Sequence, residues 1–237
     1  MGLKSDNIGL NNKNESYIIT VIVRTHNSEK FVKTSINSLI NQTLPENLYE
    51  ILVVDDGSSD DTLKILEEYK NKLKVIKKTK LGPIKAINVG IQYSSGKYIT
   101  LLDSDDTLDF NALKEFFDST LIDEYDFIYS DYNEILPNKE KKLISLKDNI
   151  FNSIAGGIIF KKTILEMVGC YDKDLFFPEY DLLIKLIQKG CSNIYIQKPL
   201  YNYFRHEGTL TSNKKSVEKG FEQLYEKYGE IKGLRDY

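Results

Sequence analysis

Short apolar runs and amphipathic segments alternate along the first half of the chain. Each run is continuous, which is typical of strands buried on both faces of a parallel sheet. The segments between the runs carry apolar residues at helical spacing. This pattern predicts strands over 17–23, 51–54, 73–76 and 98–102, and helices over 28–41, over 84–93 and in a segment that begins at Asp60 and Asp61. Such an alternation indicates βαβ units with right-handed crossovers.

The order of elements becomes less regular after residue 106. Further helices are predicted near 111–119, 162–168, 179–189 and 217–228, and further strands over 125–129, over 158–160 and, from Asn193, in two short runs. A polar, hairpin-like segment reaches residue 147. We therefore predict one α/β domain over 17–212, preceded by a flexible tail over 1–16 and followed by a helical extension over 213–237.

The composition is that of an ordinary globular protein and excludes several classes. The 32 Lys and Arg residues against 35 Asp and Glu leave a net charge of −3, so no basic field draws the chain to nucleic acid. No apolar run approaches the roughly 20 residues that span a bilayer, and the amino terminus lacks the hydrophobic stretch of a secretory signal. Cys170 and Cys191 match neither a disulfide framework nor a zinc-ligand set. These features predict a cytoplasmic protein with reduced thiols.

Association with the inner face of a membrane remains open. The predicted C-terminal helix is rich in lysine, and its exposed face could contact a membrane, although such a face is more often simply solvated. The sequence indicates no particular oligomeric state.

Two acidic clusters follow predicted strands at the point where each strand ends. Asp55 and Asp56 come directly after one buried run, and Asp103, Asp105 and Asp106 follow another. A single aspartate in such a place is usually a turn former or a helix cap. However, the carboxyl ends of parallel strands are where open α/β sheets bind ligands. Crowded carboxylates repel one another, and a divalent cation that also binds a substrate phosphate would relieve this repulsion.

The segments ITVIVRTHN, VDDGS, GKYI and LDSDD occur in an order that resembles the amino-terminal half of glycosyltransferase family 2. The resemblance is close over residues 17–106 and looser to about residue 212. It implies an α/β fold of the GT-A type, with a mostly parallel central sheet flanked by helices. It also implies a nucleotide-binding half over 17–106 and a less regular acceptor-binding half over 107–212. Enzymes of this family usually use nucleotide-diphosphate sugars.

The resemblance also implies a set of residues that bind the nucleotide-sugar. Asp56, with Asp55 beside it, matches the position that recognises the base, and a carboxylate is a good acceptor for the imide N–H of uracil. A UDP-linked donor is therefore expected. The other nucleotide-sugar residues implied in the amino-terminal half are Thr25, Asn27, Gly82, Lys85, Asp103 and Ser104.

The second acidic cluster corresponds to the Asp-x-Asp element of the family. Asp105 would hold Mn²⁺ or Mg²⁺ on the donor diphosphate, and Asp103 would contact the ribose or complete the metal shell. A metal at this place assists departure of the diphosphate as a Lewis acid. Arg205 and His206 resemble the terminal basic stretch of the family and are expected at the diphosphate, with His206 also a candidate metal ligand. The loop over 207–215 is expected to close over the donor.

The segment Pro178-Glu179-Tyr180-Asp181 resembles the start of the acceptor-side helix of the family. The alignment puts Glu179 at the position where the family usually has an aspartate that acts as base. A carboxylate there would take the proton from an acceptor hydroxyl as it attacks the anomeric carbon. Attack from the face opposite the diphosphate inverts the configuration. Asp181 is the alternative base, and both acids could instead be ordinary first-turn residues of a helix.

Three further positions depart from the family pattern. Arg24 stands where a proline is common, and His26 where an aromatic residue is common. Ile87 replaces an arginine that can assist the nucleotide, so Lys85 is the nearest basic substitute.

The sequence therefore predicts an inverting, metal-dependent glycosyltransferase with a hydroxyl acceptor, in polysaccharide or glycoconjugate biosynthesis. The main alternative is a catalytically inactive module of the same fold that binds nucleotide-sugars or glycans. A phosphatase of the haloacid dehalogenase type would carry its Asp-x-Asp motif on the first strand, unlike this chain. A dinucleotide oxidoreductase would carry a glycine fingerprint that the chain lacks.

Overall fold

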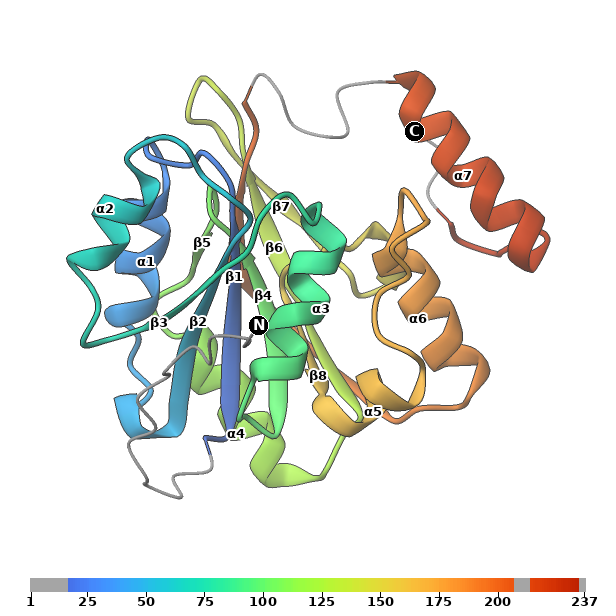
Figure 1. The fold of residues 1–237 in the computed structure, drawn as a ribbon. Helices are drawn as coiled ribbons and strands as arrows, with labels where there is room; N and C mark the ends of the chain where they lie inside the picture. The colour runs from blue at the N-terminus through green and yellow to red at the C-terminus, as the bar shows by residue number, and fades with distance from the viewer. Residues whose placement is uncertain (1–16, 207–213, 235–237) are drawn as a thin grey trace, which may run out of the picture.

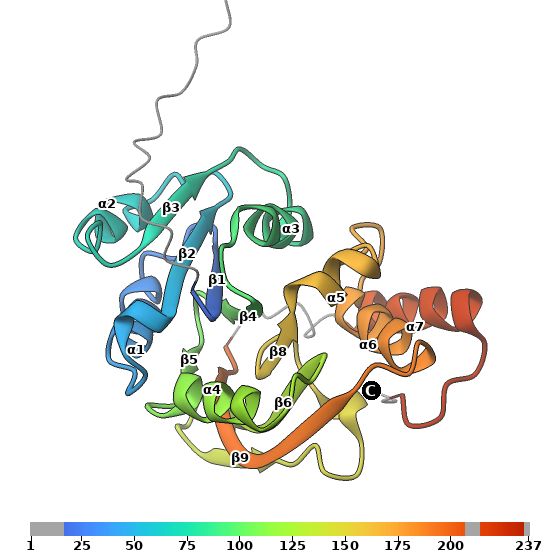
Figure 2. The same ribbon diagram turned by 90° about the horizontal axis from the view of Figure 1, so that it is seen from below.

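Among the residues that the structure describes, one nine-stranded sheet runs through the protein, with helices on both faces (Figures 1 and 2). The structure is a computed structural model, and it describes residues 17–206 and 214–234. The strand order is β3-β2-β1-β4-β8-β6-β9-β5, and β7 pairs with β6 beside this path. The predicted tail over 1–16 and most of the predicted closing loop lie outside the described residues.

The elements predicted in the first half are all present, with bounds shifted by a few residues. Strands β1, β2, β3 and β4 pair in parallel, as the continuous apolar runs predict. The strands are β1 Ile19–Thr25, β2 Tyr49–Asp55, β3 Lys74–Lys77 and β4 Tyr98–Asp103. The helices are α1 Val32–Ile40, α2 Thr62–Glu67 and α3 Pro83–Tyr93, with a 3-10 turn over Glu46–Leu48.

The second half extends the same sheet. The predicted hairpin is confirmed, because β7 pairs antiparallel with β6. The strands are β5 Thr107–Leu108, β6 Phe127–Ile135, β7 Lys141–Ile144, β8 Ile158–Lys161 and β9 Asn193–Phe204. The helices are α4 Ala112–Ile122, α5 Lys162–Met167, α6 Pro178–Gln188 and α7 Lys214–Tyr228, with a 3-10 turn over Ile150–Asn152.

One expectation for the second half is wrong. The two short runs predicted from Asn193 form the single strand β9. This strand pairs in parallel with β6, and its register shifts where Asp131 lies opposite Pro199. A proline cannot donate to the ladder, so the strand continues past it with an irregularity rather than ending there.

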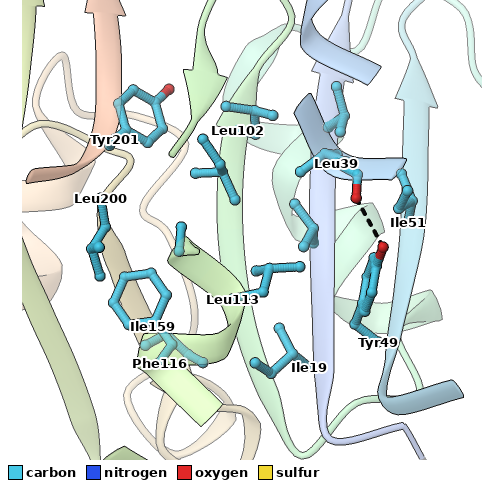
Figure 3. Packing of buried hydrophobic residues seen from close by; sticks show 14 of the residues in the cluster. Ile19, Leu39, Tyr49, Ile51, Leu102, Leu113, Phe116, Ile159, Leu200 and Tyr201 are labelled. Carbon is cyan, nitrogen blue, oxygen red and sulfur yellow. Dashed lines mark hydrogen bonds between the residues drawn. The ribbon is translucent and has the colours of Figure 1, made fainter. Parts of the chain in front are cut away.

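Two apolar clusters cover the two faces of the sheet and explain why the strands are continuously apolar. Helices α1, α2 and α4 pack on one face, and α3, α5, α6 and α7 contribute to the cluster on the other face. Ile19 and Val21 of β1 point into the first cluster, and Ile22 points into the second. Figure 3 shows part of the first cluster, in which the buried Tyr49 hydroxyl donates to the Leu39 carbonyl at 2.8 Å.

The carboxyl ends of β1, β2 and β4 meet at one edge of the sheet. Thr25, at the end of β1, pairs in register with Asp55, at the end of β2. Arg24 pairs in register with Asp103, at the end of β4. The two acidic clusters therefore lie along the same edge, where α/β sheets place their ligands.

The C-terminal helix α7 packs on the outer side of α6 (Figures 1 and 2). Val217, Gly220, Phe221 and Leu224 are its buried positions, spaced as on one face of a helix. Within the part of the chain that the structure describes, no helix is long and apolar enough to cross a membrane.

The turn before β4 tests how tightly this sheet is packed. A Cβ added at Gly96 would lie 2.5 Å from the Thr20 backbone nitrogen, which cannot move without disturbing β1. We expect Gly96→Ala to lower the free energy of unfolding by about 1–3 kcal/mol, as measured by urea denaturation. Ser95→Ala, at an exposed side chain in the same turn, is the matched control and should change stability little. Equal stability of the two variants would contradict the packing described.

Candidate active site

A cleft of about 720 Å³ opens at the carboxyl edge of the sheet. The turns after β1 and β4, the segment over 153–156 and the start of α6 form its walls. Residues far apart in the sequence thus meet around one concave space. The predicted site residues that line the cleft are Thr25, Asn27, Asp56, Gly82, Asp103, Ser104, Asp105, Glu179 and His206.

Asp56 lines the cleft and also holds the loop that leads to α3. Its carboxylate oxygens accept hydrogen bonds from the backbone N–H groups of Leu81, at 2.5 Å, and of Gly82, at 2.8 Å. A carboxylate has about four acceptor positions, so these bonds orient Asp56 without exhausting it. Gly82 has φ 89° at the start of α3, a backbone conformation that favours glycine.

Asp55 has a different role from the one expected. Its carboxylate accepts hydrogen bonds from the backbone N–H groups of Gly57 and Ser58, both at 3.1 Å, and from the Ser58 hydroxyl. The side chain is buried and does not line the cleft. Asp55 therefore shapes the turn after β2, as an aspartate in such a position commonly does.

The turn after β1 is fixed by its polar side chains. The Asn27 side-chain oxygen accepts from the Ser59 N–H at 2.8 Å and so ties this turn to the one after β2. The Ser104 hydroxyl lies 2.7 Å from the Ser28 hydroxyl and ties it to the turn after β4. The Thr25 and Ser153 hydroxyls are buried in the cleft wall without a hydrogen-bond partner among the described residues. Buried hydroxyls usually have a hydrogen-bond partner, so these two are exceptions in the wall of the cleft.

Asp103 is paired with Arg24 across the neighbouring strands. The guanidinium donates to both carboxylate oxygens, through Nε and, at 3.0 Å, through Nη2. Burial alone would lower the pKa of Arg24, but the Asp103 carboxylate raises it above the ordinary value. Arg24, which departs from the family pattern, thus supplies a fixed positive charge inside the cleft.

Asp105 faces His206 at the mouth of the cleft. Its Oδ2 lies 2.8 Å from the Nε2 of His206. The imidazole stacks on Phe31 of the turn before α1, with ring centroids 5.2 Å apart. Both side chains of the Asp105–His206 pair are about one third exposed, so this pair is open to a ligand. Asp105 and His206, which the sequence predicts at the same site, thus lie side by side at the cleft.

Asp106 is buried and secures the end of β9. It accepts hydrogen bonds from the Tyr201 hydroxyl at 2.7 Å and the Phe204 N–H at 2.8 Å. Burial, followed by the charges of Asp103 and Asp105, raises the pKa of Asp106 well above its usual value. The carboxylates of this cluster therefore repel one another, even with Arg24 present.

This cluster fits a divalent cation. One carboxylate oxygen from each of Asp103, Asp105 and Asp106 lies within 4.8 Å of the others, and oxygen ligands suit Mg²⁺ and Mn²⁺. The three carboxylates are not equally available to a metal. Asp103 is engaged by Arg24 and Asp106 by two donors, whereas the partner of Asp105 is the imidazole of His206. Asp105 is thus the residue best placed to hold a metal.

Glu179 lies in the first turn of α6, directly after Pro178, a residue favoured at this position of a helix. Its side chain lines the cleft and is half-buried. Burial raises the pKa of Glu179 to about 7, with a contribution from Asp103 in the same direction and an opposing one from Arg24. A carboxyl group that titrates near neutral pH in a cleft is suited to transfer protons.

Besides Asp55, three of the predicted site residues lie outside the cleft. Asp181 is fully buried and forms ion pairs with Lys185 and Lys227, both at 2.7 Å, so it is not placed to act as an alternative base. The Arg205 Nε lies 2.6 Å from Glu134 of β6, away from the cleft lining. The Lys85 side chain is exposed on α3 and does not line the cleft either.

Some residues of the cleft were not expected. Lys80, in the loop held by Asp56, lines the cleft, whereas Lys85 does not. The aromatic side chains of Phe31, Phe176 and Tyr203 form apolar parts of the wall. Arg24 was noted only as a departure from the family, although a rare arginine next to the end of a buried strand is a usable signal in a chain with three arginines.

The family follows from comparison with known proteins. Residues 20–145, more than half of the chain, match the sequence profile of glycosyl transferase family 2. The chain therefore belongs to this family of glycosyltransferases, as its sequence pattern predicts.

The similar proteins include bacterial glycosyltransferases. The poly(ribitol-phosphate) beta-N-acetylglucosaminyltransferase TarS of Staphylococcus aureus is 31% identical, over 68% of this chain and 29% of the relative. The UDP-Glc:alpha-D-GlcNAc-diphosphoundecaprenol beta-1,3-glucosyltransferase WfgD of Escherichia coli is 29% identical, over 80% of this chain and 64% of the relative. The chain thus spans less than two thirds of the length of either relative.

Solved structures agree on the fold. The crystal structure of S. aureus TarS in complex with UDP-GlcNAc superposes with a TM-score of 0.69 and 25% identity, covering 83% of this chain and 61% of that chain. A mannosyltransferase from Pyrobaculum calidifontis, in complex with GDP-Man and Mn²⁺, superposes with a TM-score of 0.71. It covers 90% of this chain and 65% of its own, and its 17% identity supports the fold alone. The predicted GT-A fold, with its mixed α/β architecture, is confirmed.

The raised pKa of Glu179 makes a prediction for stability. Because the folded protein favours the protonated carboxyl, the stability from this group is complete below its unfolded pKa of about 4.5 and is lost as the pH rises towards 7. Glu179→Gln is neutral at every pH. We therefore expect the free energy of unfolding of the variant, relative to wild type, to be higher at pH 8 than at pH 5, in urea titrations at both values. A difference that does not change with pH would contradict the burial of Glu179 described above.

Proposed function

We propose that the protein is an inverting glycosyltransferase that moves one sugar from a UDP-linked donor to a hydroxyl acceptor. The observation that carries this proposal is the common cleft of Asp56, Asp105 and Glu179. These are the three groups that a base-recognising, a metal-binding and a proton-accepting role require.

The nucleoside half of the donor fits the region between β1 and the loop over 79–82. Asp56 is held there by two backbone donors and retains acceptor capacity for the imide N–H of uracil. Thr25 contributes an unsatisfied hydroxyl on the same side of the cleft. The UDP and UDP-GlcNAc complexes of the TarS relative support the choice of a uridine nucleotide.

The diphosphate fits the second acidic cluster. Asp105 would hold the divalent metal, with His206 beside it and Asp103 in the outer part of the site. When bound, Mn²⁺ or Mg²⁺ supplies Lewis-acid stabilisation of the departing diphosphate. Arg24 keeps Asp103 in a fixed orientation through two hydrogen bonds. Lys80 adds a positive side chain at the cleft, close to the loop that Asp56 organises.

Glu179 is the proposed general base. Its pKa of about 7 leaves a substantial ionised fraction at neutral pH, and the ionised form accepts the proton of the acceptor hydroxyl. As the hydroxyl oxygen bonds to the anomeric carbon, the bond from that carbon to the diphosphate oxygen breaks. Attack opposite the leaving group gives inversion.

The acceptor belongs to the same proposal. The relatives TarS and WfgD are named for transfer to poly(ribitol phosphate) and to a diphosphoundecaprenol-linked sugar. We therefore propose a hydroxyl of a surface polysaccharide or of a lipid-linked glycan as the acceptor. Action in the cytoplasm, at the inner face of the membrane, is consistent with such a substrate. An inactive binding module of the same fold is the alternative, and loss of transfer on removing Glu179 separates the two.

The metal role makes the first functional prediction. Asp105→Ala should reduce the affinity for UDP in the presence of Mn²⁺ by about tenfold or more, since a charge-assisted contact in a cleft is worth 1.4 kcal/mol or more. Isothermal titration calorimetry with and without Mn²⁺ measures the effect. Asp148→Ala, at an exposed side chain outside the cleft, is the control. If Asp105→Ala bound UDP with Mn²⁺ as wild type does, the metal would lie elsewhere.

The base makes the second functional prediction. Glu179→Gln should leave UDP-sugar binding intact and lower kcat by about 100-fold or more, the usual range for loss of a general base. UDP release from UDP-GlcNAc or UDP-Glc, with a glycan acceptor preparation, measures turnover. In the wild type, kcat should rise with pH through about 7 as Glu179 loses its proton. Glu166→Gln, at an exposed acid on α5, should behave as wild type, and full activity of Glu179→Gln would rule out this base.

A further inference from the structure

The C-terminal helix α7 is bound to the segment that carries Glu179. We propose that α7 is a positioning element for the first turn of α6, and that it acts through the buried carboxylate of Asp181. The catalytic part of this inference rests on the proposed role of Glu179 as base. Its structural part, that α7 orders the segment over 172–181, can be tested without catalysis.

Asp181 is the central contact. It is fully buried in α6, two residues after Glu179. The Nζ of Lys227, on α7, lies 2.7 Å from Oδ1 of Asp181, and the Tyr228 hydroxyl donates to the same carboxylate oxygen. Burial would raise the pKa of Asp181, but these contacts and Lys185 lower it. A buried carboxylate needs charged or hydrogen-bonding partners. Because α7 supplies two of the partners of Asp181, it holds the first turn of α6 in place.

The same helix also binds the residues that lead into α6. Lys227 pairs with Asp172 at 3.0 Å, in the turn after α5. The Gln223 side chain accepts from the Phe176 N–H at 3.0 Å and donates to the Asp174 carbonyl at 3.2 Å. Asp172, Asp174 and Phe176 are therefore bound to α7 in addition to Asp181.

Close packing completes the contact. A Cβ added at Gly220 of α7 would lie 2.7 Å from the Phe176 ring and 2.8 Å from the Phe177 ring. The Phe221 ring centroid lies 4.8 Å from that of Phe177. Phe176 and Phe177 themselves line the cleft, next to Glu179. The inner surface of α7 thus forms the back of the acceptor-side wall.

This arrangement has a direct consequence for the base. Glu179 lies between Phe177 and Asp181, which α7 holds by packing and by an ion pair. A displacement of about 1 Å at a reacting group can cost about 100-fold in rate, and supporting residues commonly fix such groups. The nucleotide side of the cleft is built on the ends of β1, β2 and β4, whereas the polar contacts of Gln223, Lys227 and Tyr228 on α7 go to the segment over 172–181. Loss of the α7 contact should therefore change turnover more than donor binding.

The experiment compares Lys227→Met with wild type. We expect kcat to fall by about tenfold or more while Kd for UDP with Mn²⁺ stays unchanged, because only the position of the base is disturbed. Lys227→Arg, which keeps the charge, should restore most of the turnover. Lys219→Met, at an exposed position of the same helix, is the matched control and should behave as wild type. Unchanged kcat in Lys227→Met would overturn the catalytic part.

Hydrogen exchange tests the structural part independently of any activity. In Lys227→Met the backbone amides of residues 176–181 should exchange faster, whereas those of β1, β2 and β4 should keep their protection. Equal protection of 176–181 in variant and wild type would overturn the proposal, and so would a parallel loss of protection in the sheet. If Lys227→Met fails to fold, Tyr228→Phe removes a single hydrogen bond to Asp181 and decides by the same readouts. A wild type that binds no UDP-sugar would contradict the proposed function and leave this comparison valid.

Discussion

Repulsion among carboxylates gathered at one edge of the sheet is the constraint on which the site depends. Asp103, Asp105 and Asp106 follow one strand end, and Glu179 enters the same cleft from α6. The Arg24–Asp103 pair and the imidazole beside Asp105 reduce this repulsion. The remaining repulsion contributes, together with burial, to the raised pKa values of Asp106 and Glu179. Glu179 titrates near neutral pH because of its burial, and Asp105 stays accessible because its neighbours hold other partners.

The two sides of the cleft are supported by different elements of the fold. The nucleotide side rests on parallel strands whose apolar faces are buried in both clusters, so its turns are fixed by the sheet. The acceptor side rests on α6, whose first turn is held from behind by α7 (Figure 2). Under the proposed function, donor binding would rest on the sheet and the base on a helix that is supported separately. The contacts between α7 and the first turn of α6 would then give the C-terminal helix a part in positioning the base.

Much of the fold could be predicted from the sequence, because β1, β2 and β4 are continuous apolar runs followed by amphipathic helices. The two-residue strand β5 is too short to leave a pattern, and Pro199 made β9 look like two strands. At the site, Asp56, Asp105 and Glu179, which the motifs predict there, all line the cleft. The motifs misplaced Asp181 and Arg205. Lys227 and Glu134, which pair with these two residues, lie far away in the sequence, and the motifs carry no information about such contacts.

The central claim is that the acidic edge of the sheet and the start of α6 enclose one donor site. A crystal structure of the protein with Mn²⁺ and a non-hydrolysable UDP-sugar analogue tests it most directly. We expect a metal ligated by the Asp105 carboxylate, a uracil ring within hydrogen-bonding distance of Asp56 and the sugar between the metal and Glu179. A nucleotide bound outside this cleft, or a Glu179 carboxylate that points away from the anomeric carbon, would contradict it.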